Sequence, residues 1–465
     1  MAEIDEEVVR ELQDIVGKDN IITDEQLMEA YSHDETPGLK YIPGIVVKPE
    51  TAKQISEIMK LANSEKVPVT PRGGGTGLSG GALPVYGGIL LSTEMMNRIK
   101  EIDRDNLMVV TEPGVITGKL QKEVEKHGLF YPPDPISLDS CFIGGNIAEN
   151  AGGPRAVKYG VTRNYVSGLE IVLPNGEILK LSGKLLKNVT GYSLLDVIIG
   201  SEGTLAVITE IILKILPFPE GKVDLLIPFK RIEDATEAVT KFLNDGIVPA
   251  TIELMEGESV RMCEEFLGRD IPFSNAEAHI IVELDGNKRG ELEEDYEQIG
   301  NIALNTNAIE VFVVEDRAMQ VKVWEPRRSM GEALKAQPGK IVAREDLVVP
   351  RSRIPALIRK LKKICEDYAV KLYSFGHMGD GNIHVDVVDP SSITMDEKRL
   401  PQFVEEIYKE TILLDGAITA EHGIGLTKIK YLKFGLDSTQ IKVMRGIKGV
   451  FDPNNILNPG KIFEN

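Results

Sequence analysis

The sequence has few cysteines and no long apolar run, and each shortage excludes a class of protein. Only three cysteines occur in 465 residues, and Cys141, Cys263 and Cys365 lie too far apart for a CxxC pair. This spacing argues against a disulfide framework and against an iron–sulfur cluster. No apolar stretch approaches the roughly 18 residues that span a bilayer, so we expect no transmembrane segment.

Positive charge is also scarce. The chain carries 53 lysines and arginines against 72 aspartates and glutamates, a formal net charge of -19. Such a chain repels phosphodiester backbones and anionic lipids, so we expect no nucleic-acid partner. An anionic substrate needs local positive charge inside a pocket, which makes individual arginines and lysines informative. The acidic, helix-patterned start lacks the features of a secretory signal, and we expect a cytoplasmic protein.

Length and hydrophobic content predict more than one domain. Strand and helix patterns alternate to about Pro217, with glycine concentrated there, and Pro217 and Pro219 mark a change of character. We predict a first domain over residues 1–218 and a second over residues 219–415. The turn-rich segment 416–465 is expected to pack back against the first domain.

A glycine-rich segment, VPVTPRGGGTGLSGGALPVYGG, covers residues 67–88 directly after a predicted strand. Glycines permit backbone conformations that turn several N–H groups towards one anion, such as a pyrophosphate. Gly75, Gly77 and Gly80 also satisfy GxGxxG. That fingerprint should open a helix, however, and Pro84 and the glycines after it make a helix improbable here. A nest for a dinucleotide is favoured over a Rossmann site and over an ordinary flexible loop.

Two further segments have the composition of cofactor loops. Residues 134–166 contain paired glycines with the amides of Asn146 and Asn150, which offer donors and acceptors to a ring edge or a phosphate. Residues 200–211, GSEGTLAVITEI, place a turn before a strand. Each segment alone is more often structural. Their occurrence in this order indicates a nucleotide cofactor.

Three of the six histidines lie in two C-terminal motifs, SFGHMGDGNIHVDV and AEHGIGLTK. His377 and His384 flank a glycine turn that can bring two imidazoles together on adjoining strands. Glu421 supplies a hard oxygen ligand, which would complete a divalent metal site for zinc, iron or manganese. Adjacent residues of an extended chain point to opposite sides, so His422 can face substrate. A lone histidine is more often structural, but three beside acidic residues indicate a site.

These segments resemble the FAD-linked oxidases of the vanillyl-alcohol oxidase or PCMH type, and specifically the branch of D-lactate dehydrogenases, glycolate oxidase flavoprotein subunits and D-2-hydroxyglutarate dehydrogenases. The resemblance implies an α+β fold, with a PCMH-type FAD-binding domain of two α/β subdomains and an α/β cap domain whose sheet is largely antiparallel. It implies non-covalent FAD held by Pro71, Arg72, Gly73, Gly74, Gly75, Thr76, Gly77, Ser79, Gly80, Pro133, Asp134, Ser140, Ile143, Gly144, Gly145, Asn146, Asn150, Gly152, Gly153, Tyr159, Gly160, Glu202, Gly203, Ile208 and Asn458.

In the related enzymes the positions matching His377, His384 and Glu421 bind metal, and the position matching His422 is the catalytic base. A 2-hydroxy acid chelates a metal through its hydroxyl and carboxylate groups, and the metal then lowers the hydroxyl pKa. His422 would take the hydroxyl proton while the α-hydrogen leaves as hydride to the flavin N5. The D stereochemistry is implied by the resemblance alone.

Arg327 matches a substrate-anchoring arginine of this branch, and a guanidinium–carboxylate pair suits that role. The alternative is an exposed helix arginine, which Arg328 suits. Arg344 stands where hydroxyglutarate enzymes have lysine, and Gly331 stands where a hydroxyl side chain is expected. These departures favour D-lactate, then glycolate, over a dicarboxylate. Further candidates for substrate or flavin contact are Asn382 and Asn458, and for Asn458 a turn-forming role is equally open.

Two alternatives remain besides D-2-hydroxyglutarate oxidation. One is a non-catalytic flavoprotein subunit for electron transfer, which the intact histidine and glutamate set disfavours. The other is a relative of alkyl-dihydroxyacetone-phosphate synthase, for which the sequence offers no sign of a phosphate and lipid-tail site. Because no cluster, haem motif or membrane anchor is encoded, a partner for electron transfer is expected. The resemblance implies an electron-transferring flavoprotein, an iron–sulfur subunit, a quinone, a cytochrome or oxygen as acceptor, and we favour one of the first two.

Overall fold

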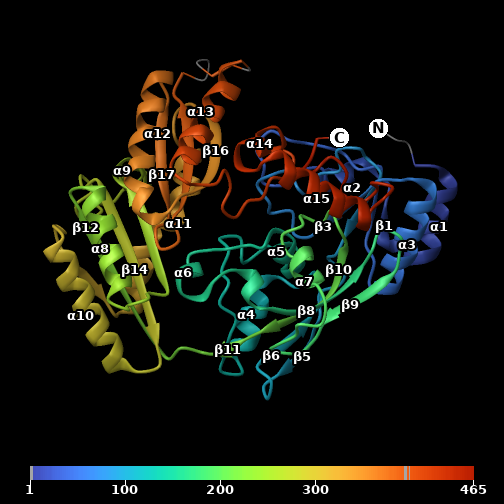
Figure 1. The fold of residues 1–465 in the computed structure, drawn as a ribbon, viewed down its shortest axis with the longest axis horizontal. Coiled ribbons are helices and arrows are strands. Elements are labelled where there is room, and N and C mark those ends of the chain that lie inside the picture. The colour runs from blue at the N-terminus through green and yellow to red at the C-terminus, as the bar shows by residue number, and fades with distance from the viewer. Residues whose placement is uncertain (1–3, 392–394, 397, 465) are drawn as a thin grey trace. The chain divides into compact units, whose positions relative to one another are not determined.

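A computed structural model describes residues 4–391, 395–396 and 398–464 of the chain. Its contacts group the residues into two compact units. Figure 1 shows the fold with the chain coloured by residue number. The first unit contains Met1–Gly152, Val161–Phe218 and Glu421–Asn465. The second contains Gly153–Gly160 and Pro219–Ala420. Within the described part of the chain, no helix is both long and apolar enough to cross a membrane.

A four-stranded sheet, with the order β1-β2-β4-β3, forms one layer of the first unit. Its strands are β1 (Ile21–Ile22), β2 (Ile45–Val47), β3 (Val69–Arg72) and β4 (Ile89–Ser92), and β4 pairs in parallel with both β2 and β3. Helices α1 (Glu6–Val16) and α3 (Ala52–Glu65) share a core with this sheet and with Ile456 and Leu457 of the C-terminal segment.

The spacing of apolar residues explains how α3 packs. Ile55, Ile58, Met59 and Ala62 recur at helical intervals and are fully buried. Thr51 caps the helix by accepting a hydrogen bond from the backbone N–H of Gln54 at 3.2 Å. The segment therefore forms an amphipathic helix with one buried face.

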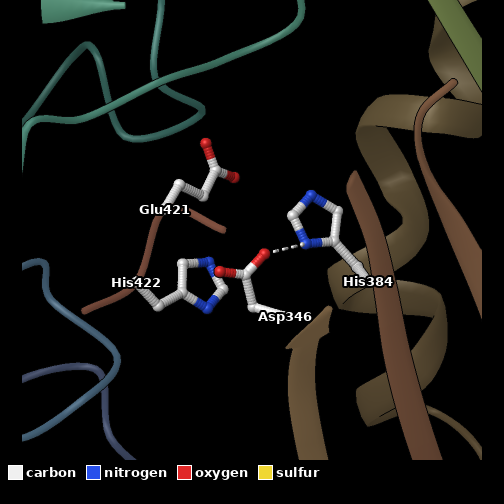
Figure 2. A group of neighbouring side chains, drawn as sticks. All are labelled: Asp346, His384, Glu421 and His422. Carbon is white, nitrogen blue, oxygen red and sulfur yellow. Dashed lines mark ion pairs between the residues drawn. The ribbon is translucent and has the colours of Figure 1, made fainter. Parts of the chain in front are cut away.

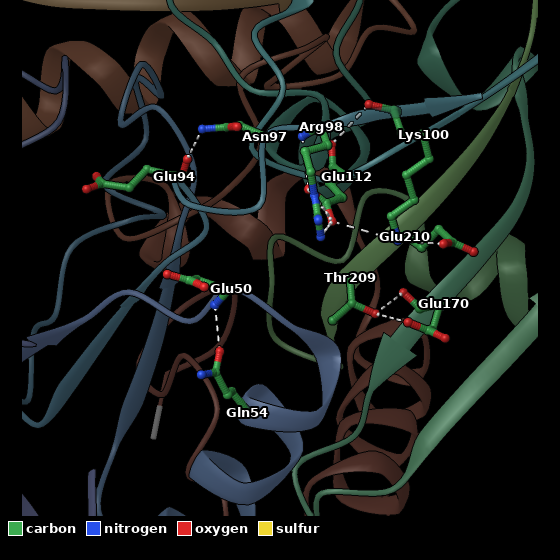
Figure 3. A network of polar contacts seen from close by, with 11 residues as sticks. Glu50, Gln54, Glu94, Asn97, Arg98, Lys100, Glu112, Glu170, Thr209 and Glu210 are labelled. Carbon is green, nitrogen blue, oxygen red and sulfur yellow. Dashed lines mark hydrogen bonds and ion pairs between the residues drawn. The ribbon is translucent and has the colours of Figure 1, made fainter. Parts of the chain in front are cut away.

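A five-stranded antiparallel sheet, with the order β5-β6-β10-β8-β9, forms the other layer of the first unit. Its strands are β5 (Ile99–Asp103), β6 (Met108–Thr111), β8 (Val166–Val172), β9 (Ile178–Ser182) and β10 (Val207–Lys214). A polar network crosses its β5–β6–β10 side (Figure 3), in which Arg98 Nη2 lies 2.7 Å from Glu112 Oε1 and Lys100 Nζ lies 2.7 Å from Glu210 Oε2. The buried Glu112 carboxylate is thus neutralised by cations at the sheet surface.

The second unit is built on one seven-stranded sheet, with the order β15-β12-β14-β13-β17-β18-β16, and every pair in it is antiparallel. This confirms the predicted antiparallel sheet. Its strands are β12 (Gly221–Phe229), β13 (Thr251–Glu256), β14 (Ala278–Gly286), β15 (Phe312–Val314), β16 (Lys340–Val348), β17 (Lys371–His377) and β18 (Asn382–Asp389).

The two faces of this sheet differ in chemistry. One face is mainly apolar and packs against a layer of helices α10 (Arg289–Asn305), α8 (Ile232–Asn244), α12 (Ile354–Tyr368) and α13 (Arg399–Leu413) (Figure 1). The other face meets α9 (Gly257–Leu267) and α11 (Arg317–Lys335) through an apolar cluster that includes Trp324 and Phe375. That second face also carries charged side chains on β13, β16, β17 and β18, so it is the face with candidate chemistry.

Shorter elements complete the two units. In the first unit they are α2 (Glu25–Met28), α4 (Thr117–Glu125), β7 (Leu129–Phe130), α5 (Ile143–Glu149), α7 (Leu194–Ile198), β11 (Leu216–Pro217), α14 (Leu432–Gly435) and α15 (Ser438–Phe451). In the second unit the segment from Gly153 to Gly160 contains α6 (Ala156–Tyr159).

Candidate functional site

The glycine-rich segment leaves the end of β3 as an irregular loop with no helix between Gly73 and Gly88. The prediction against a Rossmann helix is therefore confirmed. The loop borders a cavity of the first unit together with α5, the turn before β10 and the start of the C-terminal segment.

The glycines around this cavity differ in the space beside them. A Cβ at Gly74 would come within 2.5 Å of the carbonyl oxygen of Ser140, so the loop lies against that backbone without space for a side chain. Cβ atoms at Gly77 and Gly145 would meet no atom within 4 Å, and both residues line the cavity. Side chains there would project into the open space, which fits a cradle for a flat, phosphate-bearing group.

Several predicted cofactor residues support the cavity wall through contacts with the chain itself. Asn146 donates from Nδ2 to Thr117 Oγ1 at 2.6 Å. Asn458 donates from Nδ2 to the carbonyl oxygens of Gly81 and Glu202, at 3.0 and 2.9 Å. Asn458 thereby connects the glycine loop to the turn before β10, which gives this residue a structural role that its turn sequence alone did not reveal.

Glu202 fixes the segment that follows His422. Its carboxylate accepts hydrogen bonds from the backbone N–H groups of Ile424 at 2.8 Å and Gly425 at 2.6 Å. The backbone N–H of Leu426 donates to the carbonyl oxygen of Ser79 at 2.7 Å. The residues after His422 are therefore held against the glycine loop within the first unit.

Two buried carboxyl groups line the same cavity. Burial, followed by the charges of Glu202 and Asp34, raises the pKa of Glu149 well above its ordinary value. Burial also raises the pKa of Glu202, against the opposing effect of the two backbone N–H donors. Each group holds its proton to a higher pH than an exposed glutamate, which lowers the negative charge that a bound phosphate would meet.

The predicted FAD residues are distributed as follows. The cavity is lined by Pro71, Gly73, Gly74, Gly75, Thr76, Gly77, Gly145, Asn146, Gly152 and Glu202. The first unit also contains, away from the cavity lining, Arg72, Ser79, Gly80, Pro133, Asp134, Ser140, Ile143, Gly144, Asn150, Gly203, Ile208 and Asn458. The second unit contains Gly153, Tyr159 and Gly160, and there the Tyr159 hydroxyl donates to Asp285 at 2.7 Å.

The two predicted metal-binding histidines lie on adjoining strands of the second unit. β17 ends at His377, β18 begins at Asn382, and the glycine turn joins them as a hairpin. The imidazole centroids lie 5.1 Å apart with the rings almost perpendicular, at 88°. The prediction that this turn brings the two imidazoles together is confirmed.

Asp346 on β16 lies directly opposite His384 on β18, and its Oδ1 lies 3.5 Å from His384 Nδ1 (Figure 2). The same oxygen accepts a hydrogen bond from Asn382 Nδ2 at 2.7 Å. The other oxygen accepts the backbone N–H of Ala420 at 2.9 Å. Asp346 is fully buried, so it orients the hairpin and holds the chain just before Glu421.

Glu421 and His422 follow Ala420 at the start of the C-terminal part of the first unit. Their side chains leave consecutive positions in different directions (Figure 2), and both line the cavity of that unit. The expectation that the two side chains point apart agrees with this arrangement.

Arg327 is buried in α11 and belongs to a charged group centred on Glu253 of β13. Its Nε donates to Glu253 Oε2 at 2.5 Å, and its guanidinium lies 4.8 Å from the centroid of Phe375. The other carboxylate oxygen, Oε1, bonds His377 Nδ1. Burial raises the pKa of Glu253, but the charges of His377 and Arg327 outweigh it and hold the pKa below the ordinary value. Arg328, in contrast, is exposed.

The position of Arg327 depends on the proline before it. Pro326 lies inside α11 and lacks the N–H that would bond the carbonyl of Lys322. Arg269 Nη2 donates to that carbonyl at 3.0 Å instead. The Pro326 carbonyl accepts a hydrogen bond from Cys263 Sγ at 3.3 Å. These contacts satisfy the helix at its break and fix the direction from which Arg327 leaves it.

Glu253 and Asp346 were missed by the sequence analysis. Each lies inside a strand that reads as apolar or mixed, in TIELME and in AREDLVV. An acidic residue at an inner position of a buried strand is the signal that could have found Glu253. Arg344, on the same strand as Asp346, forms an ion pair with Asp386 at 3.3 Å.

Two protein-family models match this chain. Residues 218–462 match the C-terminal domain of the FAD linked oxidases, and residues 43–182 match an FAD binding domain. The chain is 40% identical to the glycolate oxidase subunit GlcD of Bacillus subtilis (strain 168), over 99% of this chain and 97% of that protein. It is 38% identical to a D-lactate dehydrogenase of Anaerostipes hadrus, over 98% and 97% of the two chains.

Among solved structures, p-cresol methylhydroxylase shares the fold with a TM-score of 0.80 at 16% identity, over 98% of this chain and 96% of that one. The predicted α+β fold with a PCMH-type FAD-binding domain is therefore confirmed. By its matched domains and its relatives, the chain belongs to the FAD-linked oxidases, in the group that contains glycolate oxidase subunits and D-lactate dehydrogenases.

Proposed function

We propose that the chain oxidises a small D-2-hydroxy acid to the 2-oxo acid with the help of a divalent metal ion, with D-lactate favoured and glycolate next. The observation that carries this proposal is the group of His377, His384 and Arg327 within the second unit. Two imidazoles at 5.1 Å suit a metal ion, and a buried guanidinium sharing Glu253 with His377 suits a carboxylate. A 2-hydroxy acid that chelates a metal ion needs both the metal ion and a cationic partner for its carboxylate.

Substrate binding is assigned to Arg327. Its Nε is engaged by Glu253, so the terminal NH₂ groups are the donors that would reach a substrate carboxylate. A Cβ at Gly331, one turn further along α11, would meet no atom within 4 Å, and Arg344 is paired with Asp386. Neither position offers a hydroxyl or a lysine for a second carboxylate, which favours a short substrate over D-2-hydroxyglutarate.

FAD would be held non-covalently by the glycine loop, α5 and the turn before β10. The open space beside Gly77 and Gly145 and the raised pKa values of Glu149 and Glu202 support this assignment. When bound, FAD supplies an acceptor for the hydride that leaves the α-carbon. The residues that line the cavity would exclude water from that face of the ring.

The metal ion would be held by His377, His384 and Glu421. Support for Glu421 comes from the chain itself, because Asp346 faces His384 and also binds the N–H of Ala420, the residue before Glu421. Nitrogen and carboxylate donors suit zinc, iron or manganese, and such an ion lowers the pKa of a hydroxyl group that it binds.

His422 would accept the hydroxyl proton of the substrate as general base. Base catalysis of this kind contributes about 10²- to 10⁴-fold to the rate. The segment after His422 is fixed by Glu202 and Ser79, which supports a defined position for the imidazole. Electrons would then pass to a protein acceptor, either an electron-transferring flavoprotein or an iron–sulfur subunit.

Steady-state oxidation of D-lactate with an artificial dye acceptor tests the proposal. His422→Asn should lower kcat by about 10²-fold or more, while the exposed His127→Asn should keep the native rate. Chelation should abolish activity, and added Zn²⁺ or Mn²⁺ should restore it. A native protein that is FAD-loaded, metal-replete and inactive on every 2-hydroxy acid would contradict the proposal and favour a non-catalytic electron-transfer subunit.

A further inference from the structure

Glu253 is a carboxylate in the centre of β13 and has no exposed surface. Its neighbours on the strand, Ile252 and Leu254, are fully buried apolar residues. A charged group in such a place is strongly destabilising unless opposite charges and hydrogen bonds compensate for the lost water. The compensation here comes from two residues that the proposed function places at the substrate and the metal ion.

Each carboxylate oxygen of Glu253 has a different partner. Oε1 bonds His377 Nδ1, and Oε2 accepts a hydrogen bond from Arg327 Nε at 2.5 Å. Glu253 and His377 are directly paired across β13 and β17, so their side chains leave the same face of the sheet. Arg327 reaches that face from α11. One buried group therefore connects the sheet to the helix.

The contact to His377 determines the chemistry of its ring. A carboxylate accepts hydrogen bonds and does not donate them, so Nδ1 carries the proton in this pair. In the neutral imidazole, Nε2 then carries the lone pair that a metal ligand needs. Pairs of carboxylate and histidine behind a metal ion fix the tautomer and raise the basicity of the ring.

The contact to Arg327 determines the direction of its guanidinium. Glu253 binds Nε, and the ring of Phe375 lies 4.8 Å from the guanidinium carbon. The group is thus held at one edge and on one face. Its terminal NH₂ groups keep a fixed direction, which two-point binding of a carboxylate requires.

We infer that Glu253 is a positioning residue, which presets His377 as a metal ligand through Nε2 and Arg327 as the carboxylate anchor, so that the metal and substrate sites are set by one side chain. This inference rests on the proposed function. Loss of the Glu253 carboxylate should therefore weaken metal binding and substrate binding together. Substitution of a residue that belongs to only one of the two sites should weaken binding at that site alone.

Glu253→Gln gives the sharpest test, because the amide keeps the shape and reverses one hydrogen bond. Its oxygen can still accept from Arg327 Nε, and its NH₂ group then faces His377 Nδ1. The ring must accept at Nδ1, which moves the proton to Nε2 and removes the lone pair from the ligand position. The matched control is Glu256→Gln on the same strand, a buried glutamate that bonds Lys362 Nζ at 2.7 Å.

The experiment uses the full, FAD-loaded chain. Zn²⁺ affinity is measured by competition with a chromophoric chelator, KM and kcat are measured for D-lactate, and the histidine tautomers are read from ¹⁵N NMR of the metal-free protein. For Glu253→Gln we expect a Zn²⁺ affinity about 10- to 100-fold weaker, a raised KM and a changed tautomer at one histidine. Glu256→Gln should match the native protein in all three.

Native Zn²⁺ affinity and an unchanged tautomer in Glu253→Gln would overturn the inference. If the native protein itself binds no Zn²⁺ and oxidises no hydroxy acid, the proposed function fails, while the NMR comparison still decides whether Glu253 sets the tautomer. Should the single variant not fold because Arg327 is left charged and buried, the double variant Glu253→Gln/Arg327→Met removes that charge and carries the same tautomer and Zn²⁺ measurements.

Discussion

Asp346 Oδ2 accepts the backbone N–H of Ala420 at 2.9 Å. Through its other oxygen, the same side chain binds Asn382 Nδ2 at 2.7 Å and lies 3.5 Å from His384 Nδ1. The aspartate therefore links the histidine hairpin to the point where the chain leaves the second unit, one residue before Glu421. Positions 346, 384 and 420 come from distant parts of the chain, and the buried Asp346 carboxylate brings them together.

Replacing Asp346 by asparagine should weaken both links. An amide presents an NH₂ group to one of the donors that the carboxylate accepts, so at least one buried hydrogen bond is lost. We expect the free energy of unfolding to fall by about 2 to 3 kcal/mol, measured by urea denaturation, and D-lactate oxidation to fall with it. Thr419→Val removes only the hydroxyl that lies 3.2 Å from the same carboxylate and should have a smaller effect.

A substitution that fills the cavity beside α5 should lower the affinity for FAD without lowering the stability of the protein. Gly145→Leu adds a good helix former where a Cβ meets no atom within 4 Å, so the FAD-free protein should be as stable as the native one or more stable. The side chain would occupy the cavity, and FAD affinity, measured by equilibrium titration, should fall at least tenfold, about 1.4 kcal/mol.

Gly290→Leu is the matched control, since Gly290 also lies in a helix with no atom within 4 Å and is exposed in the second unit. It should leave FAD affinity unchanged. Native FAD affinity in Gly145→Leu would place the cofactor elsewhere.

Arginine at position 327 should not be replaceable by lysine. Lys keeps the charge but offers no planar fork for a carboxylate and no Nε for Glu253. We expect KM for D-lactate to rise about 10- to 100-fold in Arg327→Lys, because a charge-assisted hydrogen bond contributes about 1.5 to 3 kcal/mol. The neighbouring Arg328→Lys, at an exposed position, should keep the native KM. Equal KM values in the two variants would remove Arg327 from the substrate site.

Asp224 predicts a pH dependence of stability in the second unit. Burial raises its pKa from 3.8 to about 6, Lys222 opposes the shift, Glu283 adds to it, and Trp324 Nε1 donates to the carboxylate at 3.0 Å. A raised folded-state pKa stabilises the fold at low pH, and this stability is lost as pH rises from about 4 to about 6. Asp224→Asn should remove that slope, at most about 1.4 kcal/mol per pH unit.

Thermal unfolding of the native protein, Asp224→Asn and the exposed control Asp245→Asn between about pH 4 and pH 7 measures this effect. The native protein and Asp245→Asn should share the same slope. A native slope retained in Asp224→Asn would assign the titration to another group.

The sequence predicted those features that local patterns determine. Consecutive glycines after a strand, with Pro84 nearby, indicated a loop without a helix, and the structure has such a loop from Gly73 to Gly88. The glycine turn between His377 and His384 indicated a hairpin, because a tight turn joins neighbouring strands.

Features that depend on contacts between distant residues were not predicted. Glu253 and Asp346 read as members of ordinary strands. The hydrogen-bond partner Arg327 lies 74 positions after Glu253, and Asn382 lies 36 positions after Asp346. Residues 134–166 read as one segment of a cofactor site, yet the structure assigns Gly153–Gly160 to the other unit, where Lys158 and Tyr159 bind Asp285. A contiguous motif contains no signal that a short stretch inside it packs with a different part of the chain.

The most direct test of the account is anaerobic reduction of the bound flavin, followed by stopped-flow absorbance, with D-lactate, L-lactate, glycolate and D-2-hydroxyglutarate in turn. The account predicts fast bleaching of the oxidised flavin band by D-lactate, slower bleaching by glycolate, and loss of both after chelation or in His422→Asn. Bleaching that is fastest with D-2-hydroxyglutarate would contradict the short-substrate assignment, and no bleaching by any of the four in FAD-loaded, metal-replete protein would contradict the dehydrogenase itself.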